Sequence, residues 1–318
     1  MNLKIIFLVA VCGFTSSAWA DFVENTDITS YVNQLIKKQK VVSIPAGTYK
    51  IDANKSIIPK DGSEIRLTPQ TKLTVIPTKY GSYRVFQIKN VDNVKILGGS
   101  LIGDKYTHLG NTGEWGMGIE IRDSKNISVS DMNIDKMWGD AIYVGTNGKN
   151  ANYNITLNNI RMNDNRRQGL TIISANKLIA SNIKATNTKG AKPASGIDIE
   201  PNNGSMILKD IELKNIVTSG NAGSGIQIGL SRYNNSTSPV SISISNHQDT
   251  KSQYGILLGA INSKALGSVT LDSLNHSSNS CFNSWSNNRF KVAVHGSTSI
   301  SKLKSCMGHL KNSNISFK

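Results

Sequence analysis

The sequence predicts an all-β protein, a single-stranded right-handed parallel β-helix with an N-terminal capping helix. The first observation is a repeat: an apolar–polar–apolar strand signal recurs six times at intervals of 23 to 30 residues. The second is that turns rich in Asn, Ser, Gly and Asp separate the copies, so each copy carries one apolar stripe. No single copy can bury that stripe, whereas stacking of successive copies does. The six signals begin at Gly118, Ala141, Gly169, Gly196, Gly225 and Gly255.

Further strand signals complete each predicted coil. A second signal precedes several copies, as at residues 126–129 and 154–157, and a third lies between the two, as at residues 132–134. Every strand is expected to pair in parallel with its copy in the next coil, about 4.8 Å along the axis. A leucine-rich repeat has a similar period, but the sequence lacks its leucine consensus and its helical segment.

The stacked coils need a cover at each end, because an open end exposes apolar core and unpaired strand edges. Residues 27–39 have the apolar spacing of a helix, and a strand signal follows at residues 41–49. We therefore assign residues 21–50 to an N-terminal cap and residues 281–318 to a closing segment of a single domain, residues 21–318. The helical stripe consists of Ile28, Val32, Leu35 and Ile36, and Asp27 or Thr29 is its candidate cap.

The first twenty residues have the three parts of a secretory signal peptide. Lys4 precedes an apolar run at residues 5–14, and Ala18, Trp19 and Ala20 form a small-x-small cleavage site. An apolar run of about ten residues is too short to cross a bilayer, which takes about twenty. The sequence therefore predicts a secreted protein, extracellular or periplasmic, with no membrane span.

The cysteine count agrees with that compartment. Removal of the signal peptide takes away Cys12 and leaves Cys281 and Cys306, in surroundings where disulfides persist. We expect these two cysteines to form a disulfide. The alternative is a pair of buried free thiols, because sequence alone does not give the distance between them.

The charge balance favours an anionic partner. The formal net charge is +15, and it becomes +14 when Lys4 leaves with the signal peptide (15 − 1). Acidic polysaccharide, teichoic acid, lipopolysaccharide and nucleic acid all match a basic surface. Aromatic residues are few and no nucleic-acid motif is present, so we expect a polysaccharide and no nucleic acid. The chain has no coiled coil or stalk that would impose a trimer, so we expect a monomer.

Stacking places the outward-facing residues of the repeat in ladders along one face. The residue between the two apolar positions of each strand points out, as does the residue after the second one. Asp140 lies in the turn before such a strand, two coils from Asp198 and Glu200, which is roughly 10 Å along the axis. Inverting glycosidases separate their two carboxyl groups by about 6.5 to 9.5 Å. The first ladder consists of Glu120, Tyr143, Thr171, Asp198 and Gln227, and the second of Arg122, Gly145, Ile173, Glu200 and Gly229.

A long insertion at residues 103–117 joins two coils beside this face and has no strand pattern. Loops on a rigid scaffold are where binding groups concentrate. We expect Trp115 to stack on a sugar ring and Glu114 and His108 to bond its hydroxyl groups. The remaining histidines have no metal-ligand spacing, so no metal site is predicted.

With these coils and caps in place, the chain resembles the pectin-lyase-like superfamily over about residues 21 to 280. The segments that look like its bacterial β-helix and phage appendage depolymerase members are Gly103-Asp104, His108, Gly113 to Gly116, Trp138-Gly139-Asp140, Arg166 to Gly169 and Gly196 to Pro201. The resemblance to polygalacturonases implies an inverting hydrolase with Asp140 as general acid. Those enzymes carry an adjacent aspartate pair, whereas Ala141 follows Asp140 here. Pectate lyases use a basic residue with Ca²⁺ held by carboxylates, and Arg166 or Arg167 with Asp198 and Glu200 resembles that arrangement.

Three functions follow from this pattern. The first is hydrolysis of a surface or extracellular polysaccharide without a cofactor, with Asp140 as acid and Asp198 or Glu200 as base. Arg166, Arg167 and Gln168 would hold substrate charge or hydroxyl groups, with Tyr143 beside them in the ladder. The second is a lyase or epimerase on a uronate polymer, for which Ca²⁺ is a possible cofactor. The third is a non-catalytic glycan-binding β-helix.

Overall fold

The computed structural model describes most of the predicted domain. The described residues are 22–148, 151–235, 237–278, 280–282, 289–296 and 315–317. The predicted signal peptide, residues 1–20, lies outside them, as does Cys306. The predicted disulfide between Cys281 and Cys306 therefore remains a prediction.

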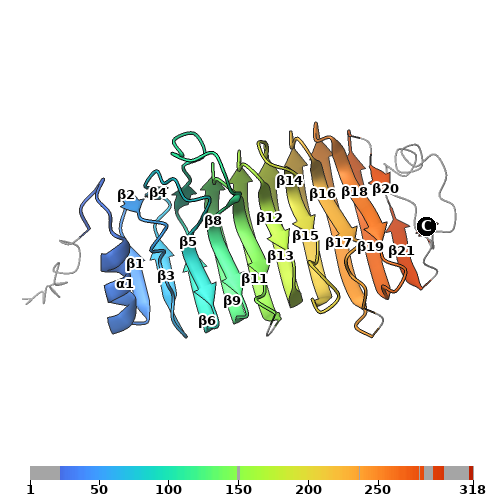
Figure 1. Ribbon diagram of the computed structural model, residues 1–318, viewed down its shortest axis with the longest axis horizontal. Coiled ribbons are helices and arrows are strands. Elements are labelled where there is room, and N and C mark those ends of the chain that lie inside the picture. Colours follow the sequence, from blue (N-terminus) through green and yellow to red (C-terminus); the bar gives the residue numbers. More distant parts are fainter. Residues whose placement is uncertain are drawn as a thin grey trace, which may run out of the picture.

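Two parallel sheets run side by side along the long axis of the molecule, and the strands follow one another from the N-terminal to the C-terminal end (Figure 1). Within the described residues one sheet has 14 strands and the other has 8. The larger sheet, sheet A, contains β1 Val41–Ile44, β2 Gly47–Ile51, β3 Glu64–Leu67, β4 Thr71–Val75, β6 Asp92–Leu97, β7 Ser100–Ile102, β9 Lys125–Asp135, β11 Asn152–Asn163, β13 Ala175–Thr186, β15 Leu208–Ser219, β17 Val240–Thr250, β19 Gly267–His276, β21 Phe290–His295 and β22 Ile315–Phe317. The smaller sheet, sheet B, contains β5 Ser82–Lys89, β8 Trp115–Arg122, β10 Asp140–Gly145, β12 Gln168–Ile172, β14 Ser195–Ile199, β16 Ser224–Leu230, β18 Tyr254–Ile261 and β20 Cys281–Phe282.

The apolar residues of the repeat stack on one another inside the coil. Every strand pair in the two sheets is parallel, and equivalent positions of successive coils are partners in the register. This stack forms the core that no single coil could bury, and it confirms the predicted right-handed parallel β-helix. One row of partners, all fully buried, consists of Ile119, Ile142, Leu170, Ile197, Ile226 and Ile256.

The second and third strand signals of each coil form one long strand instead of two. A residue with positive φ bends that strand in the middle, at Asp131 of β9 (φ 59°) and at Asn159 of β11 (φ 52°). Asn and Asp tolerate this left-handed conformation better than most residues. Their side chains also bond from coil to coil, as where Asn159 Nδ2 donates to Asp131 Oδ1 at 2.7 Å. The same bend recurs at Asn182, Asn215 and Asn246.

The N-terminal end of the coil is covered as predicted. Helix α1 spans Thr29–Lys38, and the Asp27 carboxylate accepts hydrogen bonds from the Thr29 backbone N–H (2.9 Å) and hydroxyl (2.6 Å). The predicted strand at residues 41–49 is divided into β1 and β2, because Pro45 lies between them and has no N–H for the ladder. Within the described part of the chain, no helix has the length and hydrophobicity that crossing a bilayer requires.

At the C-terminal end, the described strands continue the coil. In the predicted closing segment, residues 281–318, β20 pairs with β18 of sheet B, while β21 and β22 extend sheet A in parallel. The rest of that segment lies outside the described residues. Its described strands therefore add coils of the same kind.

A chain of buried polar side chains crosses the C-terminal coils between the two sheets. Thr218 Oγ1 donates to Asp249 Oδ1 (2.7 Å), so it can only accept from His247 Nε2 (2.8 Å). In a neutral His247 the Nδ1 atom then accepts from His276 Nε2 (2.9 Å), and His276 Nδ1 lies 2.8 Å from the Ser280 hydroxyl. The buried position of His247 favours this neutral form.

The network makes the fold sensitive to acid. Burial, and then the neighbouring His276, lower the pKa of His247 well below its ordinary value of 6.5. Below that value the unfolded chain binds a proton that the folded chain rejects, so the free energy of unfolding falls as the pH falls. We expect a loss of up to about 2 kcal/mol between pH 7 and pH 5 from this site. The melting temperature, followed by circular dichroism at both pH values, measures it.

The His247→Gln variant provides the check on this prediction. Its melting temperature is expected to vary less between pH 7 and pH 5, even where it lies below that of the wild type at pH 7. His295→Asn, which removes a half-buried histidine of β21, serves as the control with unchanged pH dependence. Equal pH dependence in the wild type and His247→Gln would contradict the assignment.

Candidate functional site

The outer face of sheet B carries the predicted ladders in the predicted register. Tyr143 pairs with Glu120 of the preceding strand and with Thr171 of the following one. Thr171 pairs in turn with Asp198, and Asp198 with Gln227. Asp198 therefore lies in this ladder, and Asp140, two coils away, reaches the same ladder through its hydrogen bond with Thr171.

The side chain of Asp140 accepts hydrogen bonds from a cation and from a hydroxyl group. Its side chain is 0% exposed, and Arg167 Nη1 donates to both of its oxygens, at 3.2 and 2.9 Å. The Thr171 hydroxyl donates to Oδ2 at 2.9 Å, a partner that sequence reasoning did not identify although Thr171 lies in the predicted ladder. Burial raises the pKa of Asp140, while Arg167 and Thr171 oppose that rise.

Asp198 lies in a different environment. Its one hydrogen bond among the described residues comes from a neutral donor, Gln168 Nε2, at 3.0 Å to Oδ2, and its buried Oδ1 has no partner there. The Gln168 amide is fixed because its Oε1 accepts the backbone N–H of Ser195 at 2.9 Å. Burial raises the pKa of Asp198 well above its ordinary range, the nearby charge of Glu200 raises it further, and the charge of Arg167 opposes that rise only in part. Asp198 is therefore the carboxyl group of this face that most favours its protonated form.

Arg167 covers the buried carboxyl groups and connects them to the surface. Its Nε lies 3.7 Å from Glu114 Oε1, and the two side chains are 16% and 38% exposed. Glu200 is half-buried and Trp115 is exposed, as expected for residues that meet a ligand. The solvent-facing part of the site is thus formed by these four side chains, with Asp140 beneath them.

His108 does not lie where the sequence placed it. Its side chain is 1% exposed, so it cannot serve as a wall that bonds sugar hydroxyl groups. Its Nδ1 is 2.7 Å from Asp104 Oδ2, and its ring stacks on Trp138 with 3.8 Å between centroids. Tyr83 donates to the same carboxylate at 2.5 Å. The expectation is corrected because His108 anchors the base of the 103–117 loop in the protein.

Arg166 also anchors this loop. Its guanidinium lies 3.9 Å from the centre of the Trp138 ring, and its Nη1 donates to the Gly113 carbonyl at 3.0 Å. The Trp138 indole N–H donates to that same carbonyl at 3.1 Å. Arg166 therefore fixes the loop next to Arg167, whereas the sequence predicted that both arginines would face the substrate.

Tyr143 is mostly buried between the charged groups. It packs in a small apolar cluster outside the main core, which consists of Met117, Tyr143, Ile173 and Met206. The Arg122 guanidinium lies 4.5 Å from the centre of the Tyr143 ring. This cluster excludes water from the flanks of Asp140 and Asp198 and so maintains the desolvation that raises their pKa values.

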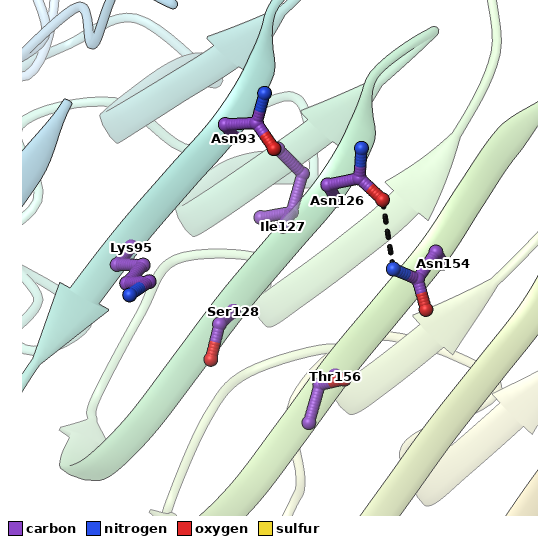
Figure 2. A pocket seen from close by; sticks show the side chains of 7 residues that line it. All are labelled: Asn93, Lys95, Asn126, Ile127, Ser128, Asn154 and Thr156. Carbon is purple, nitrogen blue, oxygen red and sulfur yellow. Dashed lines mark hydrogen bonds between the residues drawn. The ribbon is translucent and has the colours of Figure 1, made fainter. Parts of the chain in front are cut away.

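A hollow of about 310 Å³ lies on the other sheet, across β6, β9 and β11 (Figure 2). Figure 2 shows Asn154 bonded to Asn126 in its floor, with Lys95 and Thr156 at its sides. Its lining contains no carboxyl group, so it lacks the acid and base residues that the outer face of sheet B provides.

No known family model matches the sequence. It is 29% identical over 206 residues to the uncharacterized protein YclG of Bacillus subtilis (strain 168), an alignment that covers 55% of this chain and 35% of YclG. It is 28% identical over 190 residues to the SPbeta prophage-derived uncharacterized protein YorA of the same organism, an alignment that covers 50% of this chain and 32% of YorA. The match thus spans about a third of the length of each curated relative.

Solved structures establish the fold. The endo-xylogalacturonan hydrolase of Aspergillus tubingensis has a TM-score of 0.59 at 12% identity, covering 92% of this chain and 88% of that one. The Streptococcus pneumoniae surface adhesin PfbA has a TM-score of 0.59 at 12% identity, covering 92% of this chain and 85% of PfbA. The A-module of the mannuronan C-5 epimerase AlgE6 of Azotobacter vinelandii has a TM-score of 0.58 at 14% identity, covering 92% of this chain and 94% of the A-module. The chain shares the parallel β-helix fold with these proteins.

The Arg167→Ala variant tests the electrostatics of the site. It leaves Asp140 buried without its cation, which costs about 3–5 kcal/mol of unfolding free energy at pH 7. Adding Asp140→Asn is expected to recover most of that loss, because the unpaired charge is then removed. Chemical denaturation of the single and double variants measures the coupling.

Arg161→Ala is the matched control for this experiment. Arg161 is half-exposed and lies 3.6 Å from Asp135, so its loss is expected to cost at most about 1 kcal/mol. A cost for Arg167→Ala no larger than that of the control would show that Asp140 does not depend on Arg167.

Proposed function

We propose that this protein is a secreted carbohydrate-active enzyme, a glycoside hydrolase that cleaves an extracellular or cell-surface polysaccharide. The observation that carries the proposal is a pair of buried carboxyl groups on one face, Asp140 and Asp198, with different hydrogen-bond donors. Such a difference in environment assigns one carboxyl group to the acid role and the other to the base role. The shared fold is compatible with this activity, because one of the similar structures is a hydrolase.

The environments reverse the roles expected from the sequence. Asp198 lacks a cationic partner and is the better general acid, donating its proton to the glycosidic oxygen as the bond to the leaving sugar breaks. Asp140, ionised beside Arg167 and Thr171, accepts a proton from the water that attacks the anomeric carbon. The two strands are two coils apart, about 10 Å along the axis, which leaves room for that water in an inverting reaction.

Substrate approaches these groups at the outer contact of Arg167. In the structure its guanidinium covers Asp140, and its outer contact, to Glu114, is as long as 3.7 Å. A sugar that binds between Glu114 and Glu200 replaces the long contact of Arg167 to Glu114, while Arg167 keeps its hydrogen bonds to Asp140. The exposed ring of Trp115 stacks on the sugar. Gln168 keeps the Asp198 carboxyl group oriented during this exchange.

A lyase or epimerase acting on a uronate polymer is the second candidate function, and the epimerase among the similar structures favours it. In that reaction a base removes the proton beside the uronate carboxylate, and Ca²⁺ as a possible cofactor belongs to this alternative alone. A non-catalytic glycan-binding role is the third, favoured by the adhesin.

Substitution of the two carboxyl groups tests the hydrolase. Asp140→Asn and Asp198→Asn are each expected to lower the rate by at least about 100-fold, because each removes one proton transfer from the transition state. The mature protein is incubated with acidic and neutral polysaccharides, and new reducing ends are measured together with the ultraviolet absorbance of unsaturated uronates.

Asp210→Asn is the control, since Asp210 is exposed on sheet A and its positive φ accepts Asn. Its rate is expected to equal that of the wild type. Unsaturated product would identify a lyase, and glycan binding without any product, unchanged in both aspartate variants, would identify a binding protein.

A further inference from the structure

A second charged cluster lies on the same face of sheet B, on β5 and β8. Glu120 is buried, and its Oε1 accepts a hydrogen bond from Arg122 Nε at 2.7 Å. The same oxygen forms an ion pair with Arg84 Nε at 3.0 Å, without a hydrogen bond. Other donors of these guanidinium groups are fixed as well: Arg84 Nη1 bonds the Ser82 hydroxyl (2.8 Å) and Arg122 Nη1 the Thr146 carbonyl (3.1 Å). We call these three residues, Arg84, Glu120 and Arg122, the arginine cluster.

The arginine cluster has an excess of one positive charge. The two arginines lower the pKa of Glu120 against the effect of burial, so the glutamate is ionised and the cluster carries a net charge of +1 (2 − 1). Lys89 lies beside Arg122 in the register and is exposed. No second carboxylate among the described residues forms an ion pair with Arg84 or Arg122.

The arginine cluster and the carboxyl groups occupy one continuous surface. Glu120 pairs in the register with Tyr143, which pairs with Thr171, the hydroxyl partner of Asp140. Strand β8 therefore lies two coils, about 10 Å, from β12 at the centre of the proposed reaction site. The face is basic at its N-terminal end and rich in carboxyl groups at its centre.

We propose that the arginine cluster is a binding subsite for an anionic substituent of the polysaccharide, a carboxylate of a sugar located toward the N-terminal end of the β-helix from the bond that is cleaved. The proposal rests on the proposed function, and it adds the direction in which the polysaccharide extends from the cleaved bond along the β-helix. Guanidinium groups bind carboxylates through paired N–H donors, and here contacts within the protein hold both of them before the ligand arrives. Arg84 bonds the Ser82 hydroxyl, and Arg122 bonds Glu120 and the Thr146 carbonyl.

A purely structural role does not account for the second arginine. Neutralising a buried glutamate takes one cation, and Arg122, at 2.7 Å, provides it. Arg84 adds a charge whose side chain is still 20% exposed. An excess cation on a desolvated surface attracts an anion more strongly than a fully solvated cation does.

Two variants of the full chain separate these roles. Arg84→Gln removes the excess charge and leaves Glu120 paired with Arg122, so it is expected to weaken binding of polygalacturonate and alginate at least fivefold. Glu120→Gln keeps both arginines and raises the net charge, so binding is expected to be as tight as in the wild type or tighter. Affinity is measured by titration calorimetry at low and high salt, against the methyl-esterified form of each polymer as the neutral probe.

Arg161→Gln, the same change of charge on sheet A, is the control and is expected to bind as the wild type does. Equal affinities of Arg84→Gln and Arg161→Gln would overturn the subsite, as would failure of the wild type to prefer the acidic polymers. These outcomes are distinct from failure of the hydrolase. Tight, Arg84-dependent binding without product would leave the subsite standing, and cleavage unaffected by Arg84→Gln would leave the hydrolase standing.

Discussion

The parallel register between successive coils is the constraint on which the rest of the structure depends. In a strand, a shift by one residue moves every side chain to the opposite face. The stacked row from Ile119 to Ile256 prevents such a shift, because it would place apolar side chains in water and the outer polar row in the core. The same register aligns Asp140, Thr171 and Asp198 on neighbouring coils. The packing of the core therefore sets the geometry of the candidate site.

Burial has different consequences for the two carboxyl groups. Asp140 retains a cation and a hydroxyl donor, so its charge is compensated in the protein. Asp198 has no hydrogen bond from a cation or a hydroxyl group, and its buried Oδ1 has no hydrogen-bond partner among the described residues. Burying such an oxygen costs free energy and does not stabilise the fold. Ionisable groups with strongly perturbed pKa values occur preferentially at functional sites. This contrast supports a reaction in which one group gives a proton and the other takes one.

Periodicity predicted the coils, the N-terminal helix and the ladder through Tyr143 and Asp198, because alternation and repeat length are visible in a single sequence. It did not reveal β5, whose Gln87 lies between apolar residues as in the other copies, and so the arginine cluster was missed. The burial of His108 depends on Trp138 and Tyr83, whose rings contact it from other segments of the chain. The acid and base roles depend on desolvation, which has no local sequence signal.

The protonation state of Asp198 at neutral pH tests the central claim most directly. Infrared difference spectra of wild type and Asp198→Asn, recorded from pH 4 to pH 8, report the carbonyl band of a protonated carboxyl group. The account predicts such a band in the wild type near neutral pH and its loss in the variant. Complete ionisation of every carboxyl group by about pH 6, with identical spectra for the two proteins, would contradict it.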